Sequence, residues 1–514
     1  MSMLSSSLWS IFTWIFWSFL IFLLILVIYD QLWCISFKMT IPGPRQLPIF
    51  GNLLEIIRLG TYEFELRSTK QYGRVYSTRG GGTFVVNITD LDLLKKIFVK
   101  NFNSFTDRLG IEGADPWPIN KSVLMLHGAD WTRVRKIITP TFSSGKLKLM
   151  MPEINRCGVV LAKAFQKKAQ TNSSVDLKQL CGGFTMDVIA STAFGIQTNS
   201  IENPDDPFVT LAQKVFFSEI LSPFAILSVL FPRLAPLITR LGLGFWPNDS
   251  IQFFVSRTKE IIEDRKKGIN TGRVDFIQLL LDAEEEVQEE VQEENQESGS
   301  QSSSKRLDMG EILGQAFLFF IAGYETTATL LTYFLYAMAA HPEIQEKLIE
   351  ELDSVMGQEE PNYDNIHELK YLEQVVSETL RMYPPLLRMS RVATETIIID
   401  GYKFPKGIGI QYPIYQIHHD PEYYHDPEEF MPDRFTPEAR ANAHPLSFLS
   451  FGYGPRNCIG MRLALVEAKI AIVHILRSVK IVSSLETEIP LKFNLNEPFL
   501  RPLKPVQVGV ELRP

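Results

Sequence analysis

The chain has 514 residues, of which 45% are hydrophobic and 21% charged, and its formal net charge is −8. That length and apolar content suffice for a large core, and the slight acidity argues against a nucleic-acid partner. Four cysteines, at positions 34, 157, 181 and 458, are too few and too scattered for a disulfide framework, which favours a reducing compartment.

A long uncharged run occupies residues 8–28, with two serines and one threonine as its only polar members. About 20 residues span the apolar core of a bilayer, whereas a cleaved signal peptide has a shorter apolar stretch and a small-residue cleavage site. We therefore predict a transmembrane anchor in residues 1–30. Because Lys38 and Arg45 follow the run and no cation precedes it, the positive-inside rule places the body of the chain in the cytosol.

A proline-rich hinge is expected at residues 31–48, because prolines at 42, 44 and 48 prevent the anchor helix from continuing into the body. Residues 49–514 are expected to form one domain. No linker rich in proline or serine divides them, and they contain no internal repeat.

The body is predicted to be mainly α with a small β region, an α+β fold, because most segments have a helical period. Three consecutive glycines at 80–82 separate two strand-like segments and predict a hairpin. The strands are expected at residues 74–79, 83–89, 396–399 and 506–510.

Two segments depart from ordinary composition. Residues 221–246 are strongly apolar but interrupted by prolines at 223, 232 and 236, so they are too broken for a spanning helix. They form either a lid that dips into a membrane surface or core helices with tight turns, and the sequence leaves both open. Residues 283–306 carry eight glutamates and then a Ser/Gln-rich stretch, which predicts a solvated, disordered loop.

Residues 311–340 form a long apolar helix with Ala322-Gly323-Tyr324-Glu325-Thr326-Thr327 at its middle. A buried acid is costly without a partner or a function, and an interior glycine costs about 1 kcal/mol relative to alanine. Both costs are explained if the helix opens locally to hold oxygen and water, with Thr326 donating a hydrogen bond and Glu325 relaying protons. The alternative for Thr326 is a structural hydroxyl bonded back to its own helix.

Glu378 and Arg381 lie at i and i+3 and therefore share one face of a helix. We expect them to form an ion pair that stabilises the core and takes no catalytic step. His418 and His419 predict a turn rather than a metal site, because adjacent side chains point apart.

Cys458 lies in the stretch Phe451-Gly452-Tyr453-Gly454-Pro455-Arg456-Asn457-Cys458-Ile459-Gly460, and a helix is expected over residues 461–476. At a helix N-terminus the exposed N–H groups and the helix dipole favour a thiolate over a thiol. The glycines allow a tight turn beneath the sulfur, Gly460 leaves room for a flat group, and Arg456 offers a cation to an acidic group beside a metal. The alternative is a buried free cysteine that packs as a small hydrophobe.

This stretch resembles the haem-binding signature of the cytochrome P-450 superfamily, Phe-x-x-Gly-x-Arg-x-Cys-x-Gly, with each fixed position filled. The resemblance extends from residue 41 to 514 and is greatest for the microsomal family-three group of vertebrate steroid- and drug-oxidising enzymes. Other segments typical of that group are Thr139-Pro140-Thr141-Phe142-Ser143-Ser144-Gly145-Lys146-Leu147, Met186-Asp187-Val188-Ile189 and residues 322–327.

The resemblance implies a cytochrome P-450 fold in which the Cys458 thiolate binds the iron of haem b (iron protoporphyrin IX), a ligand that favours O–O cleavage. It places Phe451 and Gly460 against the haem. Other residues match family positions that bind the haem propionates through strong charge-assisted hydrogen bonds. These are Arg108, Trp131, Arg135, Arg391 and Arg456.

The resemblance also assigns two further sets of residues. Arg434 matches the third member of the ion network with Glu378 and Arg381. The substrate pocket is expected to include Ala322, Pro385, Leu386 and Leu387.

The expected function is that of a membrane-bound haem-thiolate monooxygenase that uses O2 to oxidise lipophilic substrates of steroid, fatty-acid or xenobiotic type. No Gly-x-Gly-x-x-Gly dinucleotide-binding turn occurs between a strand and a helix, so electrons from NADPH must arrive through another protein. The resemblance implies NADPH–cytochrome P-450 reductase, with cytochrome b5 as an additional donor, and a single-pass location in the endoplasmic reticulum membrane. Basic residues available to an acidic partner are Lys136, Lys146, Lys148, Arg462 and Lys469.

Two other functions stay open. A haem-thiolate isomerase would rearrange lipid peroxides without a reductase, but the Glu325–Thr326 pair argues against it, because such chemistry needs no proton relay to oxygen. A non-catalytic, membrane-tethered haem protein would need Cys458 but not Thr326.

Overall fold

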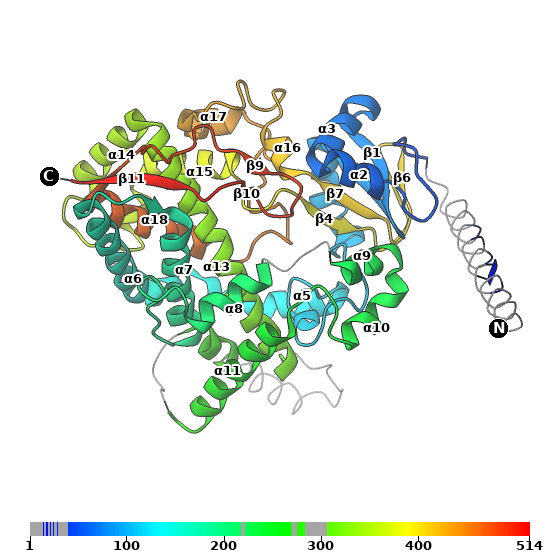
Figure 1. Ribbon diagram of the computed structural model, residues 1–514, viewed down its shortest axis with the longest axis horizontal. Helices are drawn as coiled ribbons and strands as arrows, with labels where there is room; N and C mark the ends of the chain where they lie inside the picture. The colour runs from blue at the N-terminus through cyan, green and yellow to red at the C-terminus, as the bar shows by residue number, and fades with distance from the viewer. Residues whose placement is uncertain are drawn as a thin grey trace, which may run out of the picture.

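The computed structural model describes residues 40–216, 222–269, 275–282 and 306–513, together with residues 14, 17, 18, 21, 24 and 28. Helices make up most of this part of the chain, and short strands form four small sheets (Figure 1). The expectation of a mainly α fold with a small β region is confirmed for these residues.

The helices and strands have the following bounds. The α-helices are α2 (Leu53–Leu59), α3 (Thr61–Tyr72), α4 (Leu91–Lys95), α5 (Gly128–Ile138), α6 (Ser144–Gln170), α7 (Leu177–Phe194), α8 (Pro207–Phe216), α9 (Pro223–Leu230), α10 (Ala235–Arg240), α11 (Asn248–Lys266), α13 (Met309–Ala340), α14 (Pro342–Val355), α15 (Lys370–Met382), α16 (Ile414–His418), α17 (Pro437–Asn442) and α18 (Met461–Ser478). The strands are β1 (Val75–Gly80), β2 (Thr83–Ile88), β3 (Val175–Asp176), β4 (Met389–Val392), β5 (Ile397–Ile399), β6 (Tyr402–Phe404), β7 (Gly409–Tyr412), β8 (Val479–Val482), β9 (Phe493–Asn494), β10 (Arg501–Pro502) and β11 (Gln507–Leu512).

The largest sheet has the order β1-β2-β7-β4 and lies with α2 and α3 at the right of Figure 1. β1 and β2 form the predicted antiparallel hairpin, with Val75 opposite Ile88 and Gly80 opposite Thr83. The other two strands come from a later part of the sequence: β7 pairs parallel to β2, and β4 pairs antiparallel to β7 at the edge of the sheet. A second sheet, β3-β11-β8, holds the C-terminal strand against α6.

α13 is the central helix of the fold, and its sequence explains both its start and its burial. At its N-terminus Asp308 and Glu311 form a capping box, in which each side chain accepts a hydrogen bond from the other residue's backbone N–H. Its apolar surface packs against α7, α15 and α18. Among the described residues it is the helix long and apolar enough to cross a membrane, but 78% of its most apolar window is buried, as expected for a core helix.

Two predicted segments lie largely outside the described residues. Within the predicted anchor, the six described positions are helical and exposed. Within the predicted acidic loop, Arg306 is described and positions 283–305 are not.

The apolar segment that follows residue 221 forms α9 and α10, which are bent by 120° relative to each other. Ala225 and Ile238 are buried, but Phe224, Leu237 and Leu241 are 41%, 56% and 64% exposed. Core helices with tight turns do not account for these exposed side chains, because a core helix buries its large apolar residues.

Candidate functional site

Cys458 stands at the end of a tight turn that only glycine can make. Gly452 and Gly454 have φ of 69° and 77°, and a Cβ on Gly454 would lie 2.5 Å from the Phe98 carbonyl oxygen. The Cys458 N–H closes the turn by donating to the Phe451 carbonyl at 2.8 Å. α18 then begins at Met461 with Gly460 as its N-cap, so the thiol lies at a helix N-terminus as predicted.

Burial is the largest influence on the Cys458 thiol and raises its pKa. The N–H groups of Gly460 and Met461, together with Arg135 and Arg108, act in the opposite direction. The predicted preference for thiolate is therefore not met by the protein alone, because desolvation outweighs the helix terminus. The Cys458 residue is nevertheless solvent-accessible, so its sulfur can bind a group from outside the chain. A metal cation on the sulfur would supply the missing stabilisation of the thiolate.

Four arginines from separate segments gather beside this turn. Arg456 is buried and donates to the carbonyl of Leu126 at 2.6 Å, and Arg108 donates to the carbonyl of Arg456 at 3.4 Å. Arg135 donates to the carbonyl of Asn457 at 3.0 Å. Arg391 is 1% exposed.

The arginine cluster carries more positive charge than its surroundings offset. Burial, followed by Arg108 and Arg391, lowers the pKa of Arg456 to about 9. Burial, followed by Arg391, lowers the pKa of Arg108 to about 10. Asp107 is 4.0 Å from Arg456, and it also accepts a hydrogen bond from the Gly128 N–H. A dianionic group beside Cys458 would relieve this repulsion, so the residues present fit a haem with its two propionates.

Trp131 completes the cluster from α5, one helical turn before Arg135. It is 4% exposed, and the Arg456 guanidinium lies 4.9 Å from its ring centroid. The structure thus brings together all five residues that the resemblance assigned to the propionates.

The middle of α13 has one accessible strip. Ala322 is exposed and Thr326 is half-buried, although the helix on either side is buried. The Thr326 hydroxyl donates to the Ala322 carbonyl at 2.7 Å, which is the geometry of the structural alternative. The Thr326 hydroxyl is partly accessible, so it can exchange this bond for one to a bound molecule.

Glu325 faces away from that strip. Its Oε1 accepts a hydrogen bond from the Lys178 ammonium of α7 at 2.9 Å, and its Oε2 is buried with no hydrogen-bond partner. Lys178 also donates to Thr329 at 2.9 Å and is 33% exposed, so it links the buried acid to the surface. The sequence did not identify Lys178, because the two residues are 147 positions apart.

The explanation offered for Gly323 is wrong. α13 is continuous from Met309 to Ala340 and does not open at its middle. A Cβ on Gly323 would lie 2.7 Å from Cδ1 of Ile189 on α7. The glycine is therefore explained by close packing of α13 against α7.

Glu378, Arg381 and Arg434 lie together. Arg381 donates to both oxygens of Glu378 at 2.7 and 2.8 Å, and Arg434 lies 3.4 Å from the same carboxylate. Arg381 is fully buried and also donates to the carbonyls of His418, Pro427 and Glu429. The network therefore fastens the segment around residues 427–434 to α15.

The predicted pocket segment lies beside the β9–β10 hairpin. Leu386 is half-buried and pairs through its backbone with Phe499, while Pro385 and Leu387 are buried. Of the three, Leu386 is therefore the most accessible residue.

The histidine pair is structural. His418 accepts the Leu449 N–H at 2.8 Å, and the ring of His419 lies 2.9 Å from the Tyr415 carbonyl through Nδ1. Burial lowers their pKa values to about 3 and about 4, so both rings are neutral near pH 7. Among the described residues no group of three metal-ligating side chains comes together.

One of the predicted partner-facing cations is wrong. Lys469 is 3% exposed and lies 3.6 Å from Glu373, so it cannot meet another protein. Lys136 and Arg462 are exposed, Lys146 is half-buried, and Lys148 is exposed but bonded to Asp364 at 2.9 Å.

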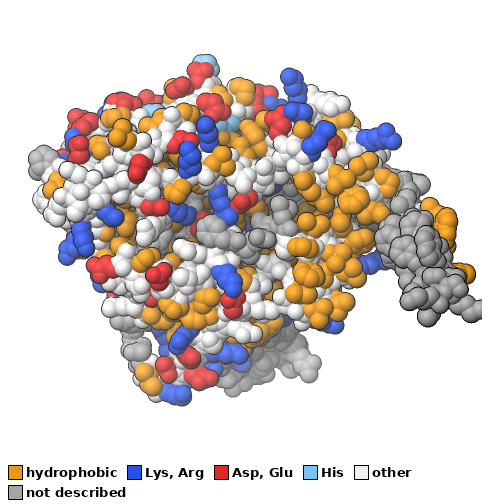
Figure 2. Space-filling model, in the orientation of Figure 1, with side chains coloured by type: hydrophobic (Ala, Val, Ile, Leu, Met, Phe, Trp, Pro, Cys, Tyr) orange, Lys and Arg blue, Asp and Glu red, His pale blue; other side chains and the backbone are white. Residues whose placement is uncertain are grey.

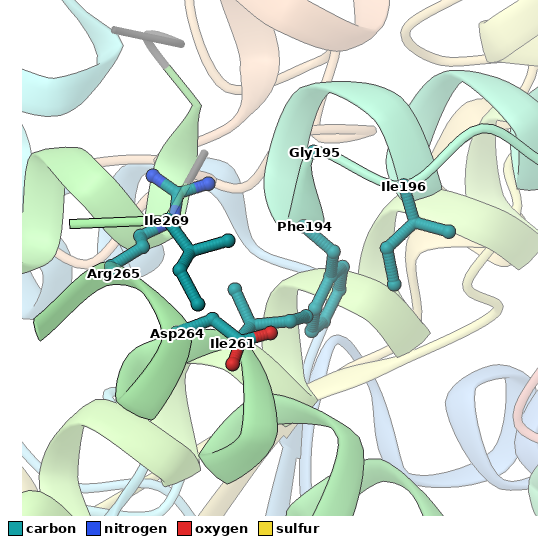
Figure 3. Close-up of a pocket in the computed structure, with 7 residues that line it drawn as sticks. All are labelled: Phe194, Gly195, Ile196, Ile261, Asp264, Arg265 and Ile269. Carbon is teal, nitrogen blue, oxygen red and sulfur yellow. The ribbon is translucent and has the colours of Figure 1, made fainter. Parts of the chain in front are cut away.

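A cavity of about 170 Å³ lies between the C-terminal ends of α7 and α11 (Figure 3). Its walls include Phe194, Ile196, Ile261 and Ile269, with Asp264 and Arg265 beside them. None of the predicted site residues lines it, so it is separate from the Cys458 site.

Comparison with known proteins gives a consistent result. The family model described as cytochrome P450 matches residues 41–510. The chain is 37% identical to cytochrome P450 3A14 of Cavia porcellus over 93% of this chain and 92% of that protein. It is 38% identical to cytochrome P450 3A2 of Rattus norvegicus, over 92% and 91% of the two chains, and 37% identical to cytochrome P450 3A7 of Homo sapiens, over 93% and 92%.

Proposed function

The chain belongs to the cytochrome P450 family, of the family-three type, and is a haem-thiolate monooxygenase of lipophilic substrates; we propose that these are steroids, fatty acids or xenobiotics. The observation that carries the proposal is the accessible Cys458 sulfur beside a cluster of four arginines. Such a site accepts a metal with attached carboxylates. A metal-free binding protein would have no need of it.

Haem b, bound through the Cys458 thiolate, supplies the activation of dioxygen when it is present. In our proposal Arg108, Arg135, Arg391 and Arg456 hold its propionates, and Trp131 contributes its indole N–H. Phe451 and Gly460 lie on either side of the thiolate turn. Gly460 has no side chain that would take up the space of a flat ring.

Proton delivery is assigned to α13. Glu325 is paired with Lys178, whose side chain is 33% exposed, so a proton from solvent has a short route to the buried carboxylate. We propose that Thr326 releases its bond to the Ala322 carbonyl and orients the water that carries the proton onward. The Oε2 of Glu325 has no hydrogen-bond partner, which supports an ordered water at this carboxylate, because a buried oxygen without a partner favours one.

The electrons are proposed to come from NADPH through NADPH–cytochrome P450 reductase, with cytochrome b5 as an additional donor. The sequence lacks a dinucleotide-binding glycine turn, which supports an external source. Lys136 and Arg462 are exposed on α5 and α18, close in sequence to Arg135 and Cys458. An acidic partner that docks on them would therefore be near the thiolate side of the site.

The protein is proposed to be a single-pass protein of the endoplasmic reticulum membrane, with an anchor at 1–30, a hinge at 31–48 and a cytosolic catalytic domain at 49–514. An apolar surface supports membrane contact. Figure 2 shows hydrophobic side chains gathered over the region of α2, α9 and α10. Exposed apolar side chains there include Leu54, Ile57, Phe224, Leu237 and Leu241. A surface of this kind would rest in the headgroup region and admit oily substrates.

The proposal is tested first by spectroscopy and then by turnover. The purified protein, reduced and treated with carbon monoxide, should show the long-wavelength Soret band of thiolate-ligated haem. Titration with a panel of steroids, fatty acids and xenobiotics should shift the spin state for at least one class, and products should require NADPH and reductase. Products from a lipid endoperoxide without NADPH would instead identify an isomerase, and a protein that never shows the band would contradict the assignment.

A further inference from the structure

Arg388 follows the predicted pocket segment directly, and its guanidinium joins three parts of the fold. Its Nε donates to Oε1 of Glu65 on α3 at 3.1 Å. Its Nη1 and Nη2 donate to the carbonyls of Glu497 and Leu495, in the loop that joins β9 to β10, at 3.2 and 3.3 Å. The side chain of Arg388 is 15% exposed and that of Glu65 is 4% exposed, so the pair is shielded from solvent.

Glu65 is itself firmly held. Burial raises its pKa, while the charge and hydrogen bond of Arg388 and the amide of Gln411 oppose this. Gln411 on β7 donates to Glu65 at 3.0 Å and lies 3.1 Å from Oδ1 of Asn87 on β2. The anchor point for Arg388 is therefore the four-stranded sheet together with α3, a rigid part of the molecule.

The β9–β10 loop is bonded in turn to the pocket segment. The Leu387 N–H donates to the Pro498 carbonyl at 2.9 Å, and the Leu500 N–H donates to the Pro385 carbonyl at 3.1 Å. These bonds flank the bridge between Leu386 and Phe499. A displacement of the loop would therefore displace Leu386, the accessible residue of the segment.

The far side of the loop reaches α8. Arg501 donates to the Phe216 carbonyl at 2.6 Å, and the rings of Phe499 and Phe216 are 5.4 Å apart at 82°. The loop thus lies between the sheet and α8. Arg388 connects the loop to the sheet side through an ion pair, in addition to the hydrogen bond that Asn496 of the loop accepts from the Thr61 N–H of α3.

We propose that the buried Glu65–Arg388 pair is a positioning device that sets which atom of a bound substrate is oxidised. It acts through the β9–β10 loop and Leu386. The inference rests on the proposed function, because it concerns the selectivity of that oxidation. Because the planar guanidinium of Arg388 binds three acceptors in a fixed geometry, it restricts the β9–β10 loop to one position. A smaller cation would allow the loop several positions. Displacements below 1 Å at a pocket wall are enough to change the atom that reacts, since reaction rates depend steeply on geometry.

The test compares Arg388→Lys and Glu65→Gln with the full-length wild-type protein. Lysine keeps the charge near Glu65 but cannot hold the two carbonyls as well. The matched control is Arg74→Lys, which alters the partly buried Arg74–Asp420 pair (2.9 Å) of the same region and has no bond to the loop. Testosterone is the probe, because its rings offer several oxidisable positions.

Both pair variants should change the ratio of hydroxytestosterone isomers by about threefold or more, with haem content and the carbon-monoxide spectrum unchanged. The control should leave the ratio unchanged. A second measurement needs no turnover: hydrogen exchange in residues 384–389 and 493–502 should accelerate in the pair variants only. A wild-type isomer ratio in both pair variants, or an equal change in Arg74→Lys, would overturn the inference. If the wild-type protein oxidises no substrate, the proposed function fails, and hydrogen exchange still decides the positioning role.

Discussion

Thr326 is a side chain whose structural and catalytic roles can be separated, because α13 carries a matched hydroxyl. Thr326 donates to the Ala322 carbonyl at 2.7 Å, and Thr332 donates to the Ala328 carbonyl at the same distance. The difference lies in access, since Thr326 is half-buried on the open strip and Thr332 is 2% exposed. A purely structural role would therefore be shared by both residues.

Thr326→Ala should lower the amount of product formed per NADPH consumed by about tenfold or more, because protons and water would no longer be oriented at the site. Thr332→Ala should leave this ratio near that of wild type, and Thr326→Ser should restore most of it. The measurement is parallel assay of NADPH consumption and product. Equal coupling in the two alanine variants would show that Thr326 is structural.

Glu467 on α18 is a buried acid that the proposed chemistry does not use. It is 3% exposed, its Oε1 has no hydrogen-bond partner, and burial raises its pKa well above the usual value of 4.5. Above pH 4.5 the unfolded chain releases this proton while the folded protein retains it. Ionisation therefore favours unfolding, and the free energy of unfolding falls as pH rises.

Glu467→Gln should remove that dependence and stabilise the protein near neutral pH. The stability lost by wild type relative to the variant should approach about 1.4 kcal/mol per pH unit above the unfolded pKa. The check is the unfolding midpoint of both proteins at several values from about pH 5 to about pH 7.5. Parallel profiles would mean that Glu467 is ionised in the folded protein.

The close packing of α13 against α7 depends on Gly323, a glycine in the interior of α13. Alanine would gain about 1 kcal/mol of helix propensity at position 323. Its Cβ would lie 2.7 Å from Cδ1 of Ile189, however, and overpacking costs about 1–3 kcal/mol. The balance therefore favours glycine as long as Ile189 keeps its δ-methyl group.

Gly323→Ala should lower the free energy of unfolding by about 1 kcal/mol. Adding Ile189→Val, which removes the δ-methyl group, should recover most of that loss. Chemical unfolding of the two single variants and the double variant gives the coupling energy between the sites. Strictly additive effects would show that the two residues do not clash.

The Glu378 network connects segments that are distant in sequence, and so it concerns the assembly of the entire domain. The Glu378 carboxylate is 0% exposed, pairs with both Arg381 and Arg434, and accepts the Met431 N–H at 2.8 Å. Arg381 in turn holds the carbonyls of His418 and Pro427. Loss of the Glu378 carboxylate would leave Arg381 and Arg434 without the negative charge that compensates them.

Glu378→Gln should destabilise the protein by about 3–5 kcal/mol and reduce the fraction that retains haem, because a buried charge pair is broken. Glu63→Gln, which removes the exposed Glu63–Arg67 pair, should cost less than about 1 kcal/mol. Haem content per polypeptide and the unfolding midpoint measure both effects. Full haem retention by Glu378→Gln would contradict the role of the network.

The local features of this protein follow from short stretches of sequence. The β1–β2 hairpin, the helix predicted at 311–340 and found as Met309–Ala340, and the turn before Cys458 each depend on neighbouring residues. Helical period, glycine turns and capping act over a few positions, so a single sequence suffices to predict them. The function could be predicted from the family resemblance for the same reason, because the most specific motif of the family is one continuous stretch of sequence.

Tertiary packing decided the rest, because it brings together residues that no local pattern relates. Lys178 pairs with Glu325 across 147 positions, and Lys469, expected at a partner surface, is buried beside Glu373. The helix opening predicted at Gly323 does not occur, and close packing against Ile189 explains the glycine instead. The Cys458 thiol shows the difference most clearly. Its place at a helix N-terminus was predictable from the sequence, but its burial depends on the segments that pack around it, and burial has the larger effect on its pKa.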